Sequence, residues 1–344
     1  MKIKSVEFKR VFYRYKEPFT ISLGTHETQE NVEVCITLED GTRGYGEASA
    51  LFVISGETPQ MLEKMEKTVQ EMIAGMSVER YELIFEQTQK LKATPAIKAA
   101  VECAVIDAFC KRHGLRQYEF FGGAKNKIET DITIGITTLE RTVEKAKKYY
   151  SEGFRILKIK VGKNLKEDVE KILKVNEIGK DLSFIVDANQ GYSPKEAVEL
   201  AQILYREKIN VVVFEQPVKK DDILGLKYVR WNSPYPVAAD ESVFTMYDAL
   251  RLIKEEAIDM INIKLMKSGI SDALAIVKLA KAAGIQLMIG CMGESSLGIS
   301  ASIHFAAGTG AFAYHDLDSH LSLVEETFRG DFKQQGPLIT LEET

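Results

Sequence analysis

Residues 155–162 read RILKIKVG and residues 182–189 read LSFIVDAN, so two short apolar strands each end near an ionisable residue, Lys160 and Asp187, 27 positions apart. From about residue 129 onward such strand cores recur every 24 to 28 residues and alternate with helical periodicity. The eight cores are TDITIGIT (130–137), RILKIKVG (155–162), LSFIVDAN (182–189), VVVFEQP (211–217), PVAADES (236–242), MINIKLMKSG (260–269), QLMIGCMGES (286–295) and FAYHDLD (312–318).

This period matches the strand–helix unit of an eight-stranded parallel barrel, which takes about 250 residues for eight units. An open doubly wound sheet also alternates strands and helices, but no GxGxxG motif follows the first strand. Eight nearly equal units therefore favour a closed, TIM-type (β/α)7β barrel in which the last strand lacks a full following helix.

The first third of the chain has a different pattern. Residues 1–50 alternate apolar and polar side chains as an antiparallel meander does, whereas residues 58–112 show helical spacing, with Gly114 as the expected stop of the last helix. We therefore expect an α/β protein: a barrel with an N-terminal α+β capping domain. The expected domains are a cap over 1–125, completed by about 320–344, and a catalytic barrel over 126–319.

Composition and charge exclude several functional classes. The 344-residue chain carries 45 basic and 50 acidic residues, a net charge of −5, which disfavours a nucleic-acid partner. Its four cysteines form no CxxC pair, so they are expected to be reduced thiols. No stretch of the sequence reaches the 18 apolar residues that would predict a membrane span, and the N-terminus is too charged for a signal peptide. We expect a cytoplasmic protein.

Reactive residues of such barrels lie at the carboxyl ends of the strands, all on one face. Here three successive strands end on the carboxylates of Asp187, Glu215 and Asp240. Bare, they would repel one another and raise each other's pKa values, whereas a hard divalent cation removes the conflict. The all-oxygen set predicts one Mg²⁺ per subunit.

Two lysines flank this trio. Lys160 lies one strand before the carboxylates and Lys264 one strand after them, so a substrate carboxylate on the metal would hold its α-carbon between two amines. Loss of an α-proton there gives a doubly charged enediolate, which a Lewis acid and a fixed cation such as Lys158 stabilise. Lys158 faces the same side of its strand as Lys160. A neighbouring cation and partial burial are expected to lower the pKa of the base.

Each of these residues also has an ordinary structural interpretation. A single Asp at a strand end is usually a helix N-cap, and a single Lys in a strand is usually a solvated charge; we assign Lys163 and Lys267 to the latter class. The register favours the catalytic interpretation, because five ionisable residues fall on five successive strands.

These residues resemble a known family, the muconate-lactonizing subgroup of the enolase superfamily. The similarity covers nearly the whole chain, including Gly44-Tyr45-Gly46-Glu47, and segments 18–26 and 50–57 resemble its two capping loops. The motifs that carry it are Lys158-Ile159-Lys160, Asp187-Ala188-Asn189, Glu215-Gln216-Pro217, Asp240-Glu241-Ser242 and Lys264-Leu265-Met266-Lys267-Ser268-Gly269. It implies Lys160 and Lys264 as acid/base catalysts and Mg²⁺ on the carboxylate trio, with Glu241 close to it.

Within the subgroup, Gly290-Cys291-Met292-Gly293-Glu294-Ser295 and Asp316-Leu317-Asp318 resemble the dipeptide epimerases, among them L-Ala-D/L-Glu epimerase. The resemblance implies an isomerase that epimerises the C-terminal residue of L-Ala-Xaa dipeptides, with the Asp pair holding the α-ammonium group. The substrate-binding residues it implies are Thr133, Lys158, Asn189, Cys291, Met292, Gly293, Glu294, Asp316, Asp318 and Gly24.

One position departs from the family pattern. Glu-selective members carry an Arg in the first capping loop, where this chain has Gly24, and Phe19, Phe52 and Val53 suggest an apolar pocket. We therefore expect a broader or more hydrophobic preference, for Phe, Tyr, Leu or Met. Same-class alternatives are N-acylamino acid racemase, o-succinylbenzoate synthase and muconate cycloisomerase. An alternative of another class is a catalytically dead barrel that acts as a binding protein. The only partners expected are the small-molecule dipeptide and further copies of the chain in a homo-oligomer.

Overall fold

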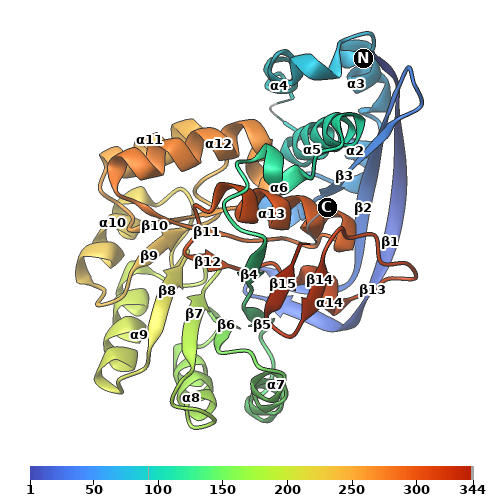
Figure 1. Cartoon of the computed structure of the whole chain (residues 1–344). Helices are drawn as coiled ribbons and strands as arrows, with labels where there is room; N and C mark the ends of the chain where they lie inside the picture. The colour runs from blue at the N-terminus through green and yellow to red at the C-terminus, as the bar shows by residue number, and fades with distance from the viewer. Residues whose placement is uncertain (92, 342–344) are drawn as a thin grey trace.

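The structure, a computed structural model, describes residues 1–91 and 93–341. An antiparallel sheet of order β13-β1-β2-β3 forms one side of the molecule (Figure 1). Its strands are β1 (Ile3–Ile21), β2 (Gly24–Leu38), β3 (Arg43–Ser49) and β13 (Leu323–Val324). The helices that accompany it are α1 (Phe52–Ser55), α2 (Pro59–Glu63), α3 (Glu66–Ile73), η1 (Val78–Arg80), α4 (Tyr81–Thr88), α5 (Pro95–His113) and α6 (Gln117–Phe120).

The strand alternation of residues 1–50 buries one face of this sheet against α5. Val32, Val34 and Ile36 on β2 have no exposed surface. On β3, a Cβ added to Gly44 would lie 2.1 Å from the carbonyl oxygen of Ala104, and one added to Gly46 would lie 2.0 Å from that of Ala100. Only glycine therefore lets β3 lie directly on α5.

Eight parallel strands form the second sheet, in the order β12-β11-β10-β9-β8-β7-β6-β5. They are β5 (Ile132–Ile134), β6 (Ile156–Lys160), β7 (Ser183–Asp187), β8 (Val211–Glu215), β9 (Val237–Ala239), β10 (Met260–Ile263), β11 (Gln286–Ile289) and β12 (Tyr314–His315). Asp131 donates its backbone N–H to the carbonyl oxygen of His315 at 2.9 Å, which joins the two ends of the sheet. The predicted (β/α)7β barrel is confirmed.

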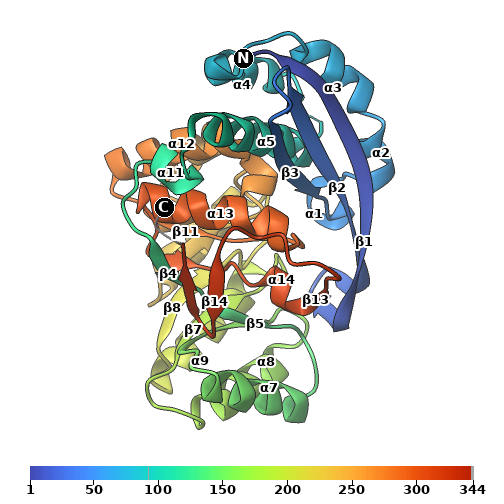
Figure 2. The same ribbon diagram turned by 45° about the vertical axis from the view of Figure 1, so that its right-hand side comes forward.

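A helix follows each of the first seven barrel strands and packs on the outside (Figures 1 and 2). These helices are α7 (Leu139–Ser151), α8 (Leu165–Asn176), α9 (Pro194–Arg206), α10 (Ile223–Asn232), α11 (Met246–Lys254), α12 (Leu265–Ala283) and α13 (Ser296–Thr309). Only the short α14 (Ser319–Ser322) follows β12, as the sequence predicted. Helix α5 packs against both β3 and α12 and so joins the N-terminal sheet to the barrel.

The C-terminal residues return to the rest of the fold. Strand β13 pairs with β1, and β14 (Lys333–Gln335) and β15 (Leu338–Thr340) pair in the order β14-β15-β4 with β4 (Lys127–Glu129). On this topology we propose a capping domain over 1–125 completed by 320–344, and a barrel domain over 126–319. Within the described residues no helix has both the length and the apolar character needed to cross a bilayer.

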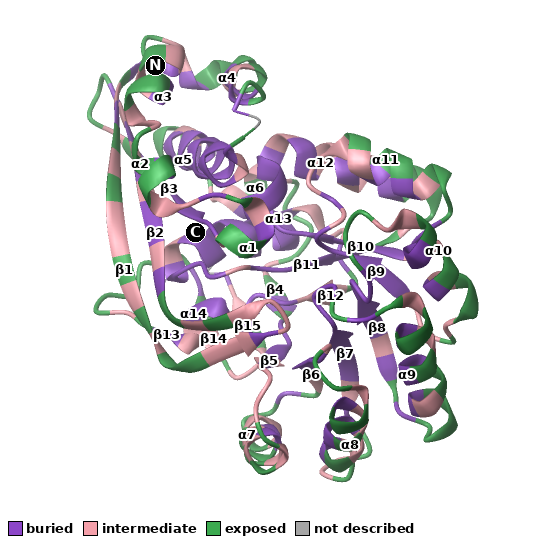
Figure 3. Ribbon diagram, turned by 180° about the vertical axis from the view of Figure 1, so that it is seen from behind, coloured by how far each residue is buried: buried purple, intermediate pink, exposed green. Residues whose placement is uncertain are grey.

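The barrel interior has an apolar layer and, nearer the carboxyl ends of the strands, a polar layer. Ile185, Val213, Ala238, Met260 and Met288 form a separate buried cluster inside the strands. Figure 3 shows the barrel strands as buried, while the outer faces of their helices are exposed. Two positions further along β7, β8 and β9 come the carboxylates Asp187, Glu215 and Asp240, and this polar layer holds the candidate site.

The helical spacing after residue 58 corresponds to two helices, α2 and α3, which are separated at Lys64 and Met65. The predicted stop at Gly114 is confirmed: this residue ends α5 with φ 65°, a left-handed conformation that glycine adopts without strain.

Candidate active site

The polar layer is built from strand ends. Lys160, Asp187 and Glu215 are the last residues of β6, β7 and β8, and Asp240 and Lys264 directly follow β9 and β10. In the eight-strand order, β6 and β10 are four positions apart. The two lysines therefore start from opposite sides of the barrel, with the three carboxylate-bearing strands between them.

Lys158 contacts three carboxylates of this polar layer. Its Nζ is 3.1 Å from Asp187 Oδ2, 2.9 Å from Glu215 Oε2 and 2.6 Å from Asp316 Oδ2, and the residue is 1% exposed. The sequence placed Lys158 in the substrate site as a fixed cation. In the structure its ammonium group is surrounded by these carboxylates, and its role toward a substrate stays a prediction.

The other lysines each contact one carboxylate. Lys160 Nζ is 2.5 Å from Asp187 Oδ2, and Lys264 Nζ is 2.7 Å from Asp240 Oδ2. Lys267, which we expected to be a solvated charge, is only 2% exposed, and its Nζ lies 2.5 Å from Asp240 Oδ1. That expectation is wrong because the start of α12 turns this side chain back toward Asp240.

Burial and ion pairs compete in setting the carboxylate pKa values. Burial raises the pKa of Asp187, but Lys160 and Lys158 outweigh it and bring the value to about 2. Burial and then the charge of Asp187 raise the pKa of Glu215 to about 8. Within the trio, neighbouring lysines thus favour the charged form of Asp187 and Asp240. The charged form of Glu215 is disfavoured, and a further cation beside it would stabilise that charge.

For Lys264, burial and ion pairs shift the pKa in opposite directions. Burial lowers it, but the attraction of Asp240 and the other carboxylates outweighs burial, so the net pKa lies above the ordinary value. A divalent cation would compete with the lysines for the same carboxylate oxygens.

The residues present fit such a cation. The three carboxylates offer oxygen ligands, and two more buried oxygens, Asn189 Oδ1 and Glu241 Oε2, have no hydrogen-bond partner among the described residues. The amide of Asn189 donates to Glu241 Oε1 at 3.1 Å, which keeps both side chains beside the trio. An all-oxygen set of this kind suits Mg²⁺.

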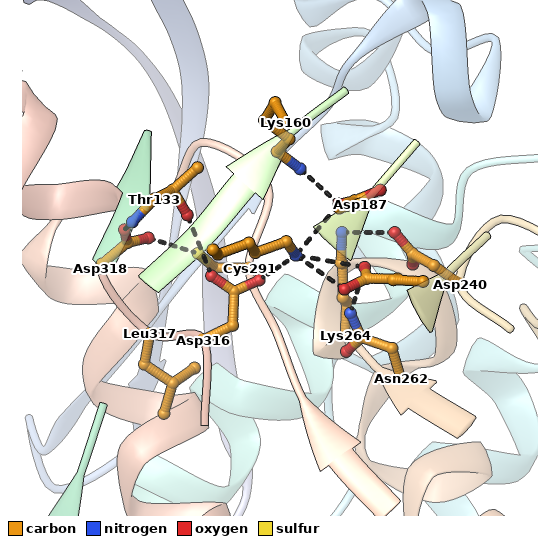
Figure 4. A network of polar contacts seen from close by, with 12 residues as sticks. Thr133, Lys160, Asp187, Asp240, Asn262, Lys264, Cys291, Asp316, Leu317 and Asp318 are labelled. Carbon is orange, nitrogen blue, oxygen red and sulfur yellow. Dashed lines mark hydrogen bonds and ion pairs between the residues drawn. The ribbon is translucent and has the colours of Figure 1, made fainter. Parts of the chain in front are cut away.

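A second cluster contains Cys291, Asp316 and Asp318, whose ligand atoms lie within 4.8 Å of one another. Burial, and then the charge of Asp316, hold the pKa of the Cys291 thiol well above its usual range. The carboxylate trio offers oxygen ligands alone, whereas this cluster includes a sulfur, so the trio suits Mg²⁺ better. Thr133 contacts both aspartates: its backbone N–H donates to Asp318 Oδ2 at 2.6 Å and its hydroxyl donates to Asp316 Oδ1 at 3.4 Å (Figure 4).

A cavity of about 50 Å³ joins these groups. Its lining consists of Tyr15, Phe19, Ile21, Leu51, Ile54, Thr133, Lys160, Asn189, Lys264, Cys291, Met292, Asp316, Asp318 and Ser319. Ligand pockets usually measure about 300–1,000 Å³, so the β1–β2 hairpin and α1 cover the site closely. Four predicted substrate residues, Gly24, Lys158, Gly293 and Glu294, do not line this cavity.

The apolar cover also differs in detail from the expectation. Phe52 is 66% exposed and Val53 is 44% exposed. Their neighbours Leu51 and Ile54 line the cavity instead, because α1 turns those two side chains inward. Phe19 lies in the lining as expected.

Comparison with known proteins identifies the family. Residues 5–122 match the mandelate racemase/muconate lactonizing enzyme N-terminal domain, and residues 141–344 match the enolase C-terminal domain-like family. The chain belongs to the mandelate racemase/muconate lactonizing enzyme family of the enolase superfamily. The resemblance found in the sequence motifs is thereby confirmed.

Three relatives illustrate where in the family the chain lies. It is 53% identical to an L-Ala-D/L-Glu epimerase of Thermotoga maritima over 98% of this chain and 97% of that protein. A substrate-liganded L-Ala-D/L-Glu epimerase from Bacillus subtilis superposes with TM-score 0.97 at 36% identity, covering 99% and 97% of the chains. A dipeptide epimerase from Enterococcus faecalis V583, complexed with Mg and L-Leu-L-Tyr, has TM-score 0.94 at 38% identity, covering 100% and 98%.

In this enolase-superfamily chain, Asn262 is a buried polar residue inside the barrel that the sequence motifs do not include. Asn262 Nδ2 donates to Glu215 Oε1 at 2.8 Å, and the residue has no exposed surface. A signal was present: Asn262 precedes Lys264 by two residues on β10, the same spacing that placed Lys158 beside Lys160. It orients a predicted metal ligand through its amide group.

Proposed function

We propose that this chain is a Mg²⁺-dependent dipeptide epimerase, which inverts the α-carbon of the C-terminal residue of L-Ala-Xaa dipeptides. The observation that carries the proposal is the pair of cavity-lining lysines, Lys160 and Lys264, on strands at opposite sides of the barrel with carboxylates between them. Two amines on opposite sides of one carbon are what inversion by proton transfer requires. The names of the relatives support the same activity.

We assign the following tasks to the residues. One lysine of the pair Lys160 and Lys264 removes the α-proton, and the other delivers a proton to the opposite face. Asp316 and Asp318 accept hydrogen bonds from the substrate ammonium group, beside Thr133. Asp187, Glu215 and Asp240 would hold Mg²⁺, which, when bound, stabilises the negative charge that develops on the substrate carboxylate.

The remaining substrate contacts follow the cavity. Asn189, Cys291 and Met292 face the bound dipeptide directly. Lys158 contributes a buried positive charge close to the reacting carboxylate, and Gly293 and Glu294 act by shaping the loop: Glu294 accepts the backbone N–H of Met292 at 2.6 Å. Gly24, at the tip of the β1–β2 hairpin, contributes by carrying no cation.

The side-chain preference is for apolar residues. Tyr15, Phe19, Ile21, Leu51 and Ile54 face the cavity from the covering segments, and within the described chain its lining contains no cation besides the two catalytic lysines. A glutamate side chain there would lose its hydration without gaining an ionic partner. The E. faecalis complex with L-Leu-L-Tyr is a precedent for apolar substrates in this fold.

The alternatives fit less well. N-acylamino acid racemase, o-succinylbenzoate synthase and muconate cycloisomerase chemistry needs no acceptor pair for a free ammonium, yet Asp316 and Asp318 lie in the cavity wall. A catalytically dead barrel would be expected to have lost a metal ligand or a base, and this chain keeps all five residues.

The test is deuterium uptake at the C-terminal α-carbon of L-Ala-L-Xaa dipeptides in D₂O, with N-acetylated dipeptides as the matched control. We expect uptake with L-Ala-L-Phe, at least tenfold lower kcat/KM for L-Ala-L-Glu, and loss of uptake in EDTA that Mg²⁺ restores. Uptake with the N-acetylated compounds alone would overturn the assignment in favour of N-acylamino acid racemase chemistry. A kcat/KM for L-Ala-L-Glu equal to that for L-Ala-L-Phe would refute the apolar preference alone.

A further inference from the structure

Helix α12, which begins directly after Lys264, is broken near its start. Gly269 has φ 67° and ψ 178° inside it, a backbone conformation that favours glycine, so the segment Leu265–Ser268 is a separate turn and the regular helix begins at Ile270. Such a restart leaves backbone N–H groups without helical partners. These groups need acceptors from another part of the molecule.

The acceptor comes from the opposite side of the domain interface. Glu102, on α5, has no exposed surface. Its Oε2 accepts the backbone N–H of Ser271 at 2.8 Å, and its Oε1 accepts the Ser271 hydroxyl at 2.9 Å. Thr88 also donates its hydroxyl to Glu102 Oε1 at 2.6 Å, which holds the carboxylate in place. A side chain distant in the sequence thus caps the restarted helix.

A second contact strengthens the same junction. Lys98, one turn before Glu102 on α5, forms a buried ion pair with Asp272. Asp272 Oδ1 in turn accepts the backbone N–H of Met246, the first residue of α11. The junction is tightly packed, because a Cβ added to Gly269 would lie 2.6 Å from Glu102 Oε2.

The turn between this junction and the active site is short and internally bonded. The carbonyl oxygen of Lys264 accepts the backbone N–H of Lys267 at 2.9 Å and the hydroxyl of Ser268 at 3.2 Å. Gly269 and Ser271 follow Lys264 by five and seven residues, so their positions constrain the Lys264 backbone through this turn. Lys160, on the other side of the barrel, contacts Asp187, and among the described residues no hydrogen bond or ion pair links it to α5.

We infer that Glu102 is a positioning residue for Lys264: by capping the restarted α12, the capping domain sets where one of the two proton-transferring lysines stands. The inference rests on the proposed function. A catalytic group misplaced by about 1 Å reacts on the order of 100-fold more slowly. Loss of the Glu102 cap should therefore slow proton transfer by Lys264 and leave proton transfer by Lys160 unchanged.

The experiment measures α-proton exchange in D₂O from each epimer of L-Ala-Phe separately. The Lys264→Ala variant identifies the epimer whose proton Lys264 removes. In Glu102→Ala we expect exchange from that epimer to fall at least tenfold relative to exchange from the other one, and in Glu102→Gln to fall less. The ratio of the two rates does not depend on the amount of folded enzyme, so partial unfolding leaves it unchanged.

Glu47→Gln is the matched control. Glu47 is 1% exposed and also caps a barrel helix, since its Oε2 accepts the backbone N–H groups of Ser295 at 3.0 Å and Gly298 at 2.9 Å, but that helix is α13. In Glu47→Gln the ratio of the two exchange rates should stay within twofold of the wild-type ratio. The inference is overturned if both Glu102 variants keep the wild-type ratio, or if Glu47→Gln shifts it equally. If the wild-type enzyme exchanges neither epimer, the proposed function itself fails.

Discussion

Replacement of either cavity lysine by alanine should abolish epimerisation and leave the fold intact. Each variant keeps a cation beside the carboxylate that loses its partner: Asp187 retains Lys158 at 3.1 Å in Lys160→Ala, and Asp240 retains Lys267 in Lys264→Ala. No buried carboxylate is therefore left unpaired, which is the costly outcome of breaking an ion pair. Acid–base groups contribute about 10²–10⁴-fold to a rate, and we expect kcat to fall by that factor or more.

The two variants should differ in proton exchange. Because the lysines stand on opposite sides of the barrel, Lys160→Ala should lose exchange from one epimer and Lys264→Ala from the other, as followed by NMR in D₂O. Lys163→Ala, an exposed lysine three residues beyond Lys160, is the matched control and should exchange both epimers. The two-base reasoning is refuted if both variants lose exchange from the same epimer, or if either epimerises within tenfold of the wild-type rate.

Two other perturbations test the binding of the substrate ammonium group and the effect of buried Glu57 on stability. Asp316→Asn and Asp318→Asn should each raise the dipeptide KM by about 10- to 100-fold, since a hydrogen bond to a charged group contributes about 1.5–3 kcal/mol, and an unchanged KM in the double variant would contradict their assignment. Glu57, which accepts the backbone N–H of Ala96 at 3.0 Å, has its pKa raised by burial to about 7. Its folded state binds a proton more tightly than the unfolded chain does, so this contribution to stability is present below about pH 4.5 and is lost as the pH rises through 7. In Glu57→Gln the free energy of unfolding, measured by denaturant titration at each pH, should fall by up to about 3 kcal/mol less than in the wild type between those pH values. The same pH dependence in variant and wild type would contradict this.

The sequence alone determined the barrel and the placement of its strand-end residues. Strand alternation and the repeat of 24 to 28 residues are local properties, so they could be read without knowing which segments meet. The rule that parallel strands end on one face then brought Lys160, Asp187, Glu215, Asp240 and Lys264 together. Asn262 followed the same alternation and could have been found in the same way.

Only the tertiary structure decided which charges are buried and which side chains cover the cavity. Lys267 looks like any surface lysine in the sequence, and its burial depends on the turn that brings it back to Asp240. Leu51 and Ile54, and not Phe52 and Val53, face the cavity because of the way α1 packs. Glu102 reaches α12 across 169 residues of sequence. Burial and capping of this kind depend on contacts between distant segments, and no local pattern encodes them.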